Sequence, residues 1–336
     1  MTTATVSAPV PGHYRPSRLT VIRYVVGYAA ILGTIPYLAL KFAWLSGSTI
    51  GFRDTSLASD NSIVVLNGVT AGMDLIAVLI ALAFTHAWGQ RLPAWLVIVP
   101  MWVATGLLVP IAIMLPLAGM GELVASDASS TDPGVLEPWV QPMVYGGFAW
   151  QGVMLVIAFL LYARVRWAAV FTARTEAARP GATHAVQKAL ATGTALAAAL
   201  IALGYLGVAV GAFTQGRESM PVTGHLVYAM HGVLVIAGAG GLLAMVRRWR
   251  GPFWLPLALA WTGAGGMFAW GAWTLTVVLA DTALSGGAQT PVLDNMLNFG
   301  KLVLGVVIGV TSLMLLAERP ATNPAAHPRR SRFDQA

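Results

Sequence analysis

Long apolar segments, almost free of charge, are the feature of this chain that most limits how it folds. A helix needs about 20 mostly apolar residues to cross a lipid bilayer, and eight segments of the sequence meet that requirement. These segments are residues 21–45, 63–88, 93–120, 142–165, 188–213, 224–246, 253–281 and 292–317. Only 10% of the residues are charged, whereas a soluble globular domain carries about 25%. The sequence therefore predicts an all-α integral membrane protein with eight transmembrane helices.

Lys and Arg are distributed unevenly between the expected loops. With eight spans, the basic residues of both tails, of the 166–187 loop and of the turns before 93–120 and 253–281 all fall on one side. The opposite side has Arg53 and Arg217, beside several acidic residues. Because cytoplasmic loops are enriched in Lys and Arg, we expect both termini in the cytoplasm and the protein in the cell (plasma) membrane. The net charge of +7 is thus a topology signal, and we expect the lipid bilayer, but no nucleic acid, as a partner.

A short motif occurs twice, 159 residues apart. Pro-x-Trp-Leu, followed by Trp and Gly, begins at Pro93 and again at Pro252, and five of fourteen aligned positions are identical. The two copies fall in the third and seventh spans, so the repeating unit has four spans and both units enter the membrane from the same side. This predicts a tandem, parallel repeat.

The repeat and the spans together divide the chain into five parts. We expect a disordered cytoplasmic tail at 1–20, a four-helix unit at 21–165, a cytoplasmic linker at 166–187, a second four-helix unit at 188–317 and a basic cytoplasmic tail at 318–336.

Polar side chains on four of the spans mark the candidate site, because ionisable groups in lipid face the bundle interior or a wet cavity. On each span they recur at helical spacing, on one face. They are Tyr37 and Lys41; Asn67, Thr70 and Asp74; Tyr228 and His231; and Asp294, Asn298 and Lys301. All lie toward the extracytoplasmic side, so we expect them to converge on one polar pocket open to that side. The Trp motif is duplicated whereas these polar groups are not, which favours one asymmetric site.

Asp74 and Lys301 are the two charges expected to lie deepest. Asp74 lies roughly 16 Å from the outer end of its span, at 1.5 Å per residue. It is either a functional group that pairs with Lys301, or a neutral carboxyl bonded to a neighbouring helix. Lys301 either forms that pair or reaches toward the surface, and Lys41, near the outer end of its span, is expected to extend to the interface. His231 is either a ligand-facing group or a hydrogen bonder between helices.

No cofactor or metal site is expected. The sequence has no Cys and no phosphate-binding glycine loop of the Walker type. The four-plus-four layout resembles that of haem A synthases, and this resemblance implies paired histidine ligands for haem. The chain departs from that pattern, because His86 and His231 are expected in opposite leaflets, so they cannot ligate one haem.

Two short blocks carry a second resemblance. Pro36-Tyr37-Leu38-Ala39-Leu40-Lys41 and Asn298-Phe299-Gly300-Lys301 resemble segments of uncharacterised multi-pass membrane proteins of high-GC Gram-positive bacteria. The resemblance covers these blocks alone and implies a membrane location without an activity.

Three functions fit these observations. The first is a transporter or exporter of a small amphipathic molecule, with Asp74 as the proton- or cation-coupling group and Lys301 as its partner or as a counter-charge for substrate. The second is a membrane enzyme acting on a lipid or prenyl substrate, with Asp74 as the general acid of a cyclase-like reaction. The third is a non-catalytic subunit or scaffold in which the polar faces only pack.

Overall fold

Long helices make up nearly all of the computed structural model, which describes residues 18–56, 60–124, 136–177, 180–213, 220–279 and 291–318. The long helices of this part of the chain are α1 (Arg18–Leu45), α2 (Asn61–Thr85), α3 (Ala94–Val124), α4 (Val140–Arg166), α6 (His184–Ala209), α7 (Val222–Val246), α8 (Trp254–Leu279) and α9 (Val292–Ala317). A 3-10 turn, η2 (Ala87–Arg91), and a short helix, α5 (Ala168–Thr172), connect them. Most of the two expected tails, residues 1–17 and 319–336, lies outside the described residues.

Seven of these helices are long and apolar enough to cross a membrane, which confirms that the chain is a helical, multi-pass membrane protein. The helix outside this set is α8, which has the length of its neighbours. Its sequence is rich in Trp, Gly and Thr, which are less apolar than Leu or Val. The expectation of eight spans therefore stays a prediction, and it depends on α8.

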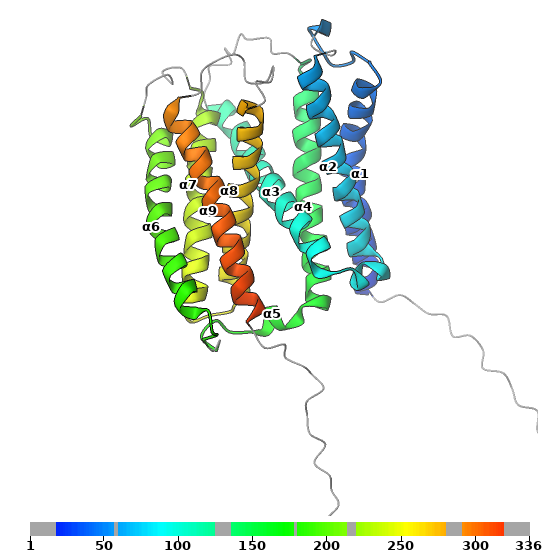
Figure 1. Ribbon diagram of the computed structural model, residues 1–336. Coiled ribbons are helices and arrows are strands. Elements are labelled where there is room, and N and C mark those ends of the chain that lie inside the picture. The colour runs from blue at the N-terminus through cyan, green and yellow to red at the C-terminus, as the bar shows by residue number, and fades with distance from the viewer. Residues whose placement is uncertain are drawn as a thin grey trace, which may run out of the picture.

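The helices pack as two groups of four (Figure 1). In the first group, α1 packs against α2 and α4, and α3 packs against α2 and α4. In the second, α6 packs against α7 and α9, and α8 packs against α7 and α9. The groups meet mainly where α3 contacts α8, with a smaller contact between α3 and α7. When α6, α7, α8 and α9 are matched with α1, α2, α3 and α4 in chain order, the helices of each group thus have equivalent neighbours.

Residues of the duplicated Trp motif form the contact between α3 and α8. The indole Nε1 of Trp102 donates a hydrogen bond of 3.1 Å to the backbone oxygen of Trp261. A Cβ atom added to Gly106 would collide with the backbone of Gly265, and one added to Gly265 would meet the backbone oxygen of Trp102 at 2.8 Å. Small residues of this kind let two helix backbones approach in lipid, so the motif has a packing role.

Each group has an apolar core, and the two tryptophans are exchanged between the cores. Trp102 belongs to α3 but packs against the core of the second group, where its ring stacks on Phe268 at 5.0 Å between centroids. Trp261 belongs to α8 but packs against the core of the first group and stacks on Phe159 at 5.6 Å. The two groups therefore interlock through one aromatic side chain from each.

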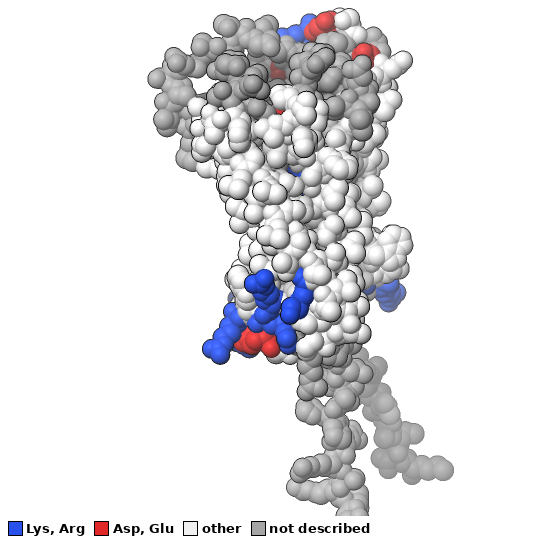
Figure 2. Space-filling view, turned by 60° about the vertical axis from the view of Figure 1, so that its left-hand side comes forward, with Lys and Arg blue, Asp and Glu red and all other residues white. Residues whose placement is uncertain are grey.

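Basic side chains gather at the end of the molecule where α1 begins and α9 ends (Figure 2). At this end the segment after α5 is tied to the turn between α7 and α8, because Phe253 N donates to Ala173 O at 3.0 Å and Thr175 N donates to Gly251 O at 2.9 Å. The Glu176 carboxylate accepts hydrogen bonds from backbone N–H groups, including that of Gly251, and from Arg174. These contacts lower the pKa of Glu176 to about 2. The connection between the two groups is thus anchored.

Candidate functional site

The predicted site residues lie in two places, one in each helix group. The first set is on α1 and α2 and comprises Tyr37, Lys41, Asn67, Thr70 and Asp74. The second set is on α7 and α9 and comprises Tyr228, His231, Asp294, Asn298 and Lys301. The main helix neighbours of α2 are α1, α3 and α4, and those of α9 are α6, α7 and α8. The four polar faces therefore do not converge on one pocket, because periodicity assigns a helix face and not the helix that covers it.

Lys41 is buried inside the first group, with only 5% of its surface exposed. Its ammonium donates a hydrogen bond of 2.6 Å to Asn67 Oδ1. It also lies 4.6 Å from the centre of the Tyr37 ring and 5.3 Å from that of Trp44, which are favourable cation–π positions. The expectation that Lys41 extends to the membrane interface is wrong, because the amide and the two rings together replace water around its charge.

Asp74 is also buried, and one of its carboxylate oxygens lacks a hydrogen bond. It is 5% exposed, and its Oδ2 accepts no hydrogen bond from any residue that the structure describes. Its charge interacts with that of Lys41, although the two form no ion pair among the described residues. The Tyr37 side chain lies close enough to interact with both Thr70 and Asp74. The charge of Lys41 thus acts on Asp74, and among the described residues Asp74 and Lys301 form no ion pair, which was one of the two alternatives for these side chains.

The second set is organised around Tyr205 of α6. The Tyr205 hydroxyl donates to Asn298 Oδ1 at 3.2 Å, and the Tyr228 hydroxyl donates to Asp294 Oδ1 at 2.9 Å. The Tyr205 ring also lies 5.3 Å from the ring of His231. Sequence reasoning did not include Tyr205 in the site. The available signal was its Tyr-Leu dipeptide, which occurs at Tyr37 in α1 as well.

Lys301 is the most deeply buried charge of the second set, at 1% exposed. Its ammonium lies 5.4 Å from the centre of the Tyr205 ring and interacts electrostatically with Asp294 and His231. Within the described part of the chain it donates no hydrogen bond. Both lysines thus have an aromatic face and an acid nearby, but among the described residues only Lys41 also has an amide acceptor.

Some buried polar atoms in and beside these two sets have no partner. Among the described residues, five buried side-chain nitrogen or oxygen atoms lack a hydrogen-bond partner; two of them, Asp74 Oδ2 and His231 Nε2, belong to the sets, and a third, Trp270 Nε1, belongs to a neighbour of His231. Trp270, on α8, lies 6.3 Å from His231 between ring centres and was not among the predicted pocket residues. A buried polar atom left unpaired costs about 1–3 kcal/mol, so each needs an explanation. A ligand that enters and supplies the missing partners is such an explanation.

Comparison with known proteins does not assign the chain to a family. No family model matches it, and neither the curated proteins nor the solved structures contain a match. In the described part of the chain, no three His, Cys, Asp or Glu residues are placed to hold a metal ion together. The function must therefore be argued from the two polar sets.

Proposed function

We propose that the protein is an eight-span transporter or exporter of a small amphipathic molecule, built from two parallel four-helix repeats. The observation that carries the proposal is a set of buried polar atoms that find no hydrogen-bond partner in the described part of the chain, Asp74 Oδ2 in one group and His231 Nε2 and Trp270 Nε1 in the other. In membrane proteins, ionisable groups held inside the bundle mark substrate and ion pathways.

The helix packing supports a repeat with α8 as a true span. The two groups have equivalent helix neighbours in the same chain order. Trp102 and Trp261 are equivalent in the duplicated motif, and they contact each other directly. Equivalent residues meet in this way only near a rotation axis, as in an isologous interface. An axis along the membrane normal requires α8 to cross as α3 does, and it places both termini on the basic, cytoplasmic side.

Within this proposed repeat, the surroundings of Tyr37 and Tyr205 are related in position but differ in chemistry. Each tyrosine has a lysine ammonium near its ring, but Lys41 lies on the same helix as Tyr37, 4.6 Å from its ring centre, whereas Lys301 comes from α9 and lies 5.4 Å from that of Tyr205. Tyr37 neighbours Thr70 of α2, whereas Tyr205 neighbours His231 of α7. The tyrosine is retained in each unit, while the groups around it have diverged.

This divergence suggests a division of roles within the proposed transporter. Asp74, with one free carboxylate oxygen and Lys41 nearby, is suited to take up and release a proton or to hold a cation. Lys301, with the indole of Trp270 and the imidazole of His231, is suited to bind the polar end of a substrate, with Lys301 as its counter-charge. The surrounding tyrosines and tryptophan would contact an apolar body.

Accessibility from both membrane faces tests the proposal without knowledge of the substrate. The chain has no Cys, so a single Thr70→Cys variant gives one reactive thiol beside Asp74. In proteoliposomes of known orientation, we expect a small, charged methanethiosulfonate reagent to modify it from either face, because a transporter opens its pocket to each side in turn. Ile76→Cys is the matched control on the same helix, since Ile76 is 49% exposed on the outer, lipid-facing surface and should react from neither face. Reaction of Thr70→Cys from one face alone would favour an enzyme pocket, and no reaction would favour a scaffold.

A further inference from the structure

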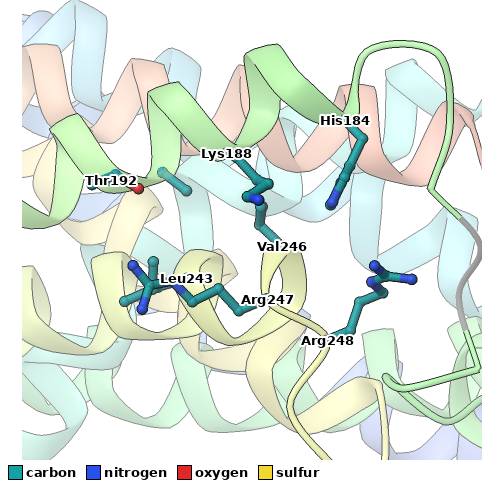
Figure 3. A pocket seen from close by; sticks show the side chains of 8 residues that line it. His184, Lys188, Thr192, Leu243, Val246, Arg247 and Arg248 are labelled. Atoms are coloured by element: carbon teal, nitrogen blue, oxygen red, sulfur yellow. The ribbon is translucent and has the colours of Figure 1, made fainter.

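A basic pocket lies at the end of the molecule where the termini emerge, between the start of α6 and the end of α7 (Figure 3). Its volume is about 370 Å³, within the range of small-ligand sites. The residues that line it are His184, Lys188, Ala191, Thr192, Leu243, Val246, Arg247 and Arg248. Three of them carry a full positive charge, and the apolar ones come from the facing sides of the two helices.

Two of the charges in this pocket are not used by the protein itself. The side chains of Lys188 and Arg247 form no hydrogen bond or ion pair with any described residue. Other arginines at the same end are engaged: Arg23 donates to Phe84 O at 2.7 Å, and Arg166 donates to Leu92 O at 2.5 Å. The pocket thus has cationic groups available for a ligand.

The basic residues of the pocket are not all placed where they would stabilise the ends of α6 and α7. Arg247 ends α7, where a cation is favourable to the helix dipole, but His184 and Lys188 lie in the first turns of α6, where a cation is unfavourable. Glu318 lies near His184, and its carboxylate accepts hydrogen bonds from Thr183 N at 2.9 Å and Gln187 Nε2 at 3.0 Å. These hydrogen bonds hold the pKa of Glu318 below its usual value, and among the described residues Glu318 forms no ion pair with Lys188 or Arg247.

An apolar surface leads from the pocket into the membrane. On α6, Leu196, Leu200 and Leu203 follow the pocket residue Thr192 on the same helix face and are 68%, 72% and 65% exposed. From Thr192 to Leu203 the helix rises about 16 Å, close to the roughly 15 Å depth of one hydrocarbon leaflet.

The exposed side of α7 has the same character. Ile236 and Val233 follow the pocket residue Leu243 on one helix face and are 53% and 59% exposed. Gly240 lies between them and the pocket, and open space surrounds the position that its Cβ would take. A charged pocket therefore continues into an apolar, lipid-facing surface on both helices.

We propose that this pocket binds the phosphate headgroup of an anionic phospholipid, whose acyl chains lie along the exposed faces of α6 and α7. Basic pockets between transmembrane helices on the cytoplasmic side recognise such headgroups. Lys188 and Arg247, from opposite walls, contact the phosphate oxygens, and Leu196 and Ile236 contact the chains. A free phosphate ion would use the same cations but would gain nothing from the apolar surface.

Arg248 can be replaced by glycine without strain in the backbone. Its φ of 55° lies in the left-handed region, which glycine adopts without steric cost. Arg248 N donates to Met245 O and Trp249 N donates to Ala244 O, the hydrogen-bond pattern of a helix end that glycine usually completes. Arg248→Gly should therefore preserve the end of α7 while it removes one pocket charge.

Native mass spectrometry of the purified full chain, titrated with phosphatidylglycerol in detergent micelles, tests the proposal. We expect one phosphatidylglycerol to bind tightly, phosphatidylcholine of equal chain length to bind far more weakly, and Lys188→Gln/Arg247→Gln to lose affinity roughly tenfold or more. Arg248→Gly should also weaken binding while the unfolding temperature stays the same or rises.

The control variant removes two charges from the same end outside the pocket. Arg91→Gln/Arg250→Gln should bind phosphatidylglycerol as the parent does. Equal losses in the two double variants would show a general surface attraction and overturn the proposal. Displacement of the lipid by inorganic phosphate at comparable concentration would identify a free-anion site instead, and equal binding of phosphatidylcholine would also overturn it.

Discussion

Lys41 and Asn67 form the shortest polar contact of the first polar set, 2.6 Å from Nζ to Oδ1. Both residues are buried, so the amide oxygen replaces a water molecule that the ammonium would otherwise bind. Removal of one partner leaves the other buried without its hydrogen bond, which costs more than the net value of the bond. The pair is therefore coupled in a way that a double-mutant cycle can measure.

We expect Asn67→Leu to lower the free energy of unfolding by about 1–3 kcal/mol, because it strands the Lys41 ammonium. Lys41→Met in the same background should recover part of that loss, since both partners are then apolar. Thermal unfolding in detergent of the parent, the two single variants and the double variant measures the coupling. Strictly additive losses would show that the two side chains act independently.

The site residues show how far single positions could be predicted. Asp74 and Lys301 were recognisable because a charge inside an apolar segment is conspicuous. Their partners were not, because helical periodicity does not specify which helix lies opposite. Tyr205 and Trp270 were not assigned to the pocket, because aromatic residues are common in any membrane span.

At the scale of helices, α3 and α8 approach closely because each has glycine at the contact. A Cβ atom on Gly106 would collide with the backbone of Gly265, and neither backbone can move without displacing its whole helix. By contrast, a Cβ atom on Gly72 of α2 would meet nothing within 4 Å. Two chemically identical substitutions thus have opposite expected effects.

Gly106→Ala should lower the free energy of unfolding by roughly 1–3 kcal/mol, as overpacked sites do. Gly72→Ala should be neutral or slightly stabilising, because alanine favours helix over glycine. The unfolding temperatures of the two purified variants, compared with that of the parent, check the prediction. Tolerance of Gly106→Ala would mean that the α3–α8 contact is looser than described.

For the whole molecule, membrane character and helix positions could be predicted from the sequence, because about 20 apolar residues in a row have few alternatives to a span. Each long helix overlaps the segment expected for it. The packing of the helices could not be predicted in the same way, since most lipid-facing and core-facing residues of a span are equally apolar. The duplicated motif identified α3 and α8 as counterparts, but it did not predict that the two helices contact each other.

Whether α8 crosses the membrane decides the topology of the second unit. Arg250 and Val292 flank α8 and the segment that follows it; Val292 is 75% exposed, and Arg250 is also exposed. In intact cells, we expect a membrane-impermeant maleimide to label Val292→Cys, while Arg250→Cys is labelled only after permeabilisation. Labelling of both positions from the same side would exclude α8 as a span and, with it, the parallel repeat.

The exchange of Trp102 and Trp261 between the two apolar cores has a consequence for the history of the molecule. On the proposed repeat, a four-helix ancestor could have donated this side chain to a second copy of itself and accepted one in return, as a symmetric homodimer does. Fusion of the two copies would then have kept them together at high effective concentration. Each copy would then have been released from the requirement to remain identical, so that the side chains around Tyr37 and Tyr205 diverged.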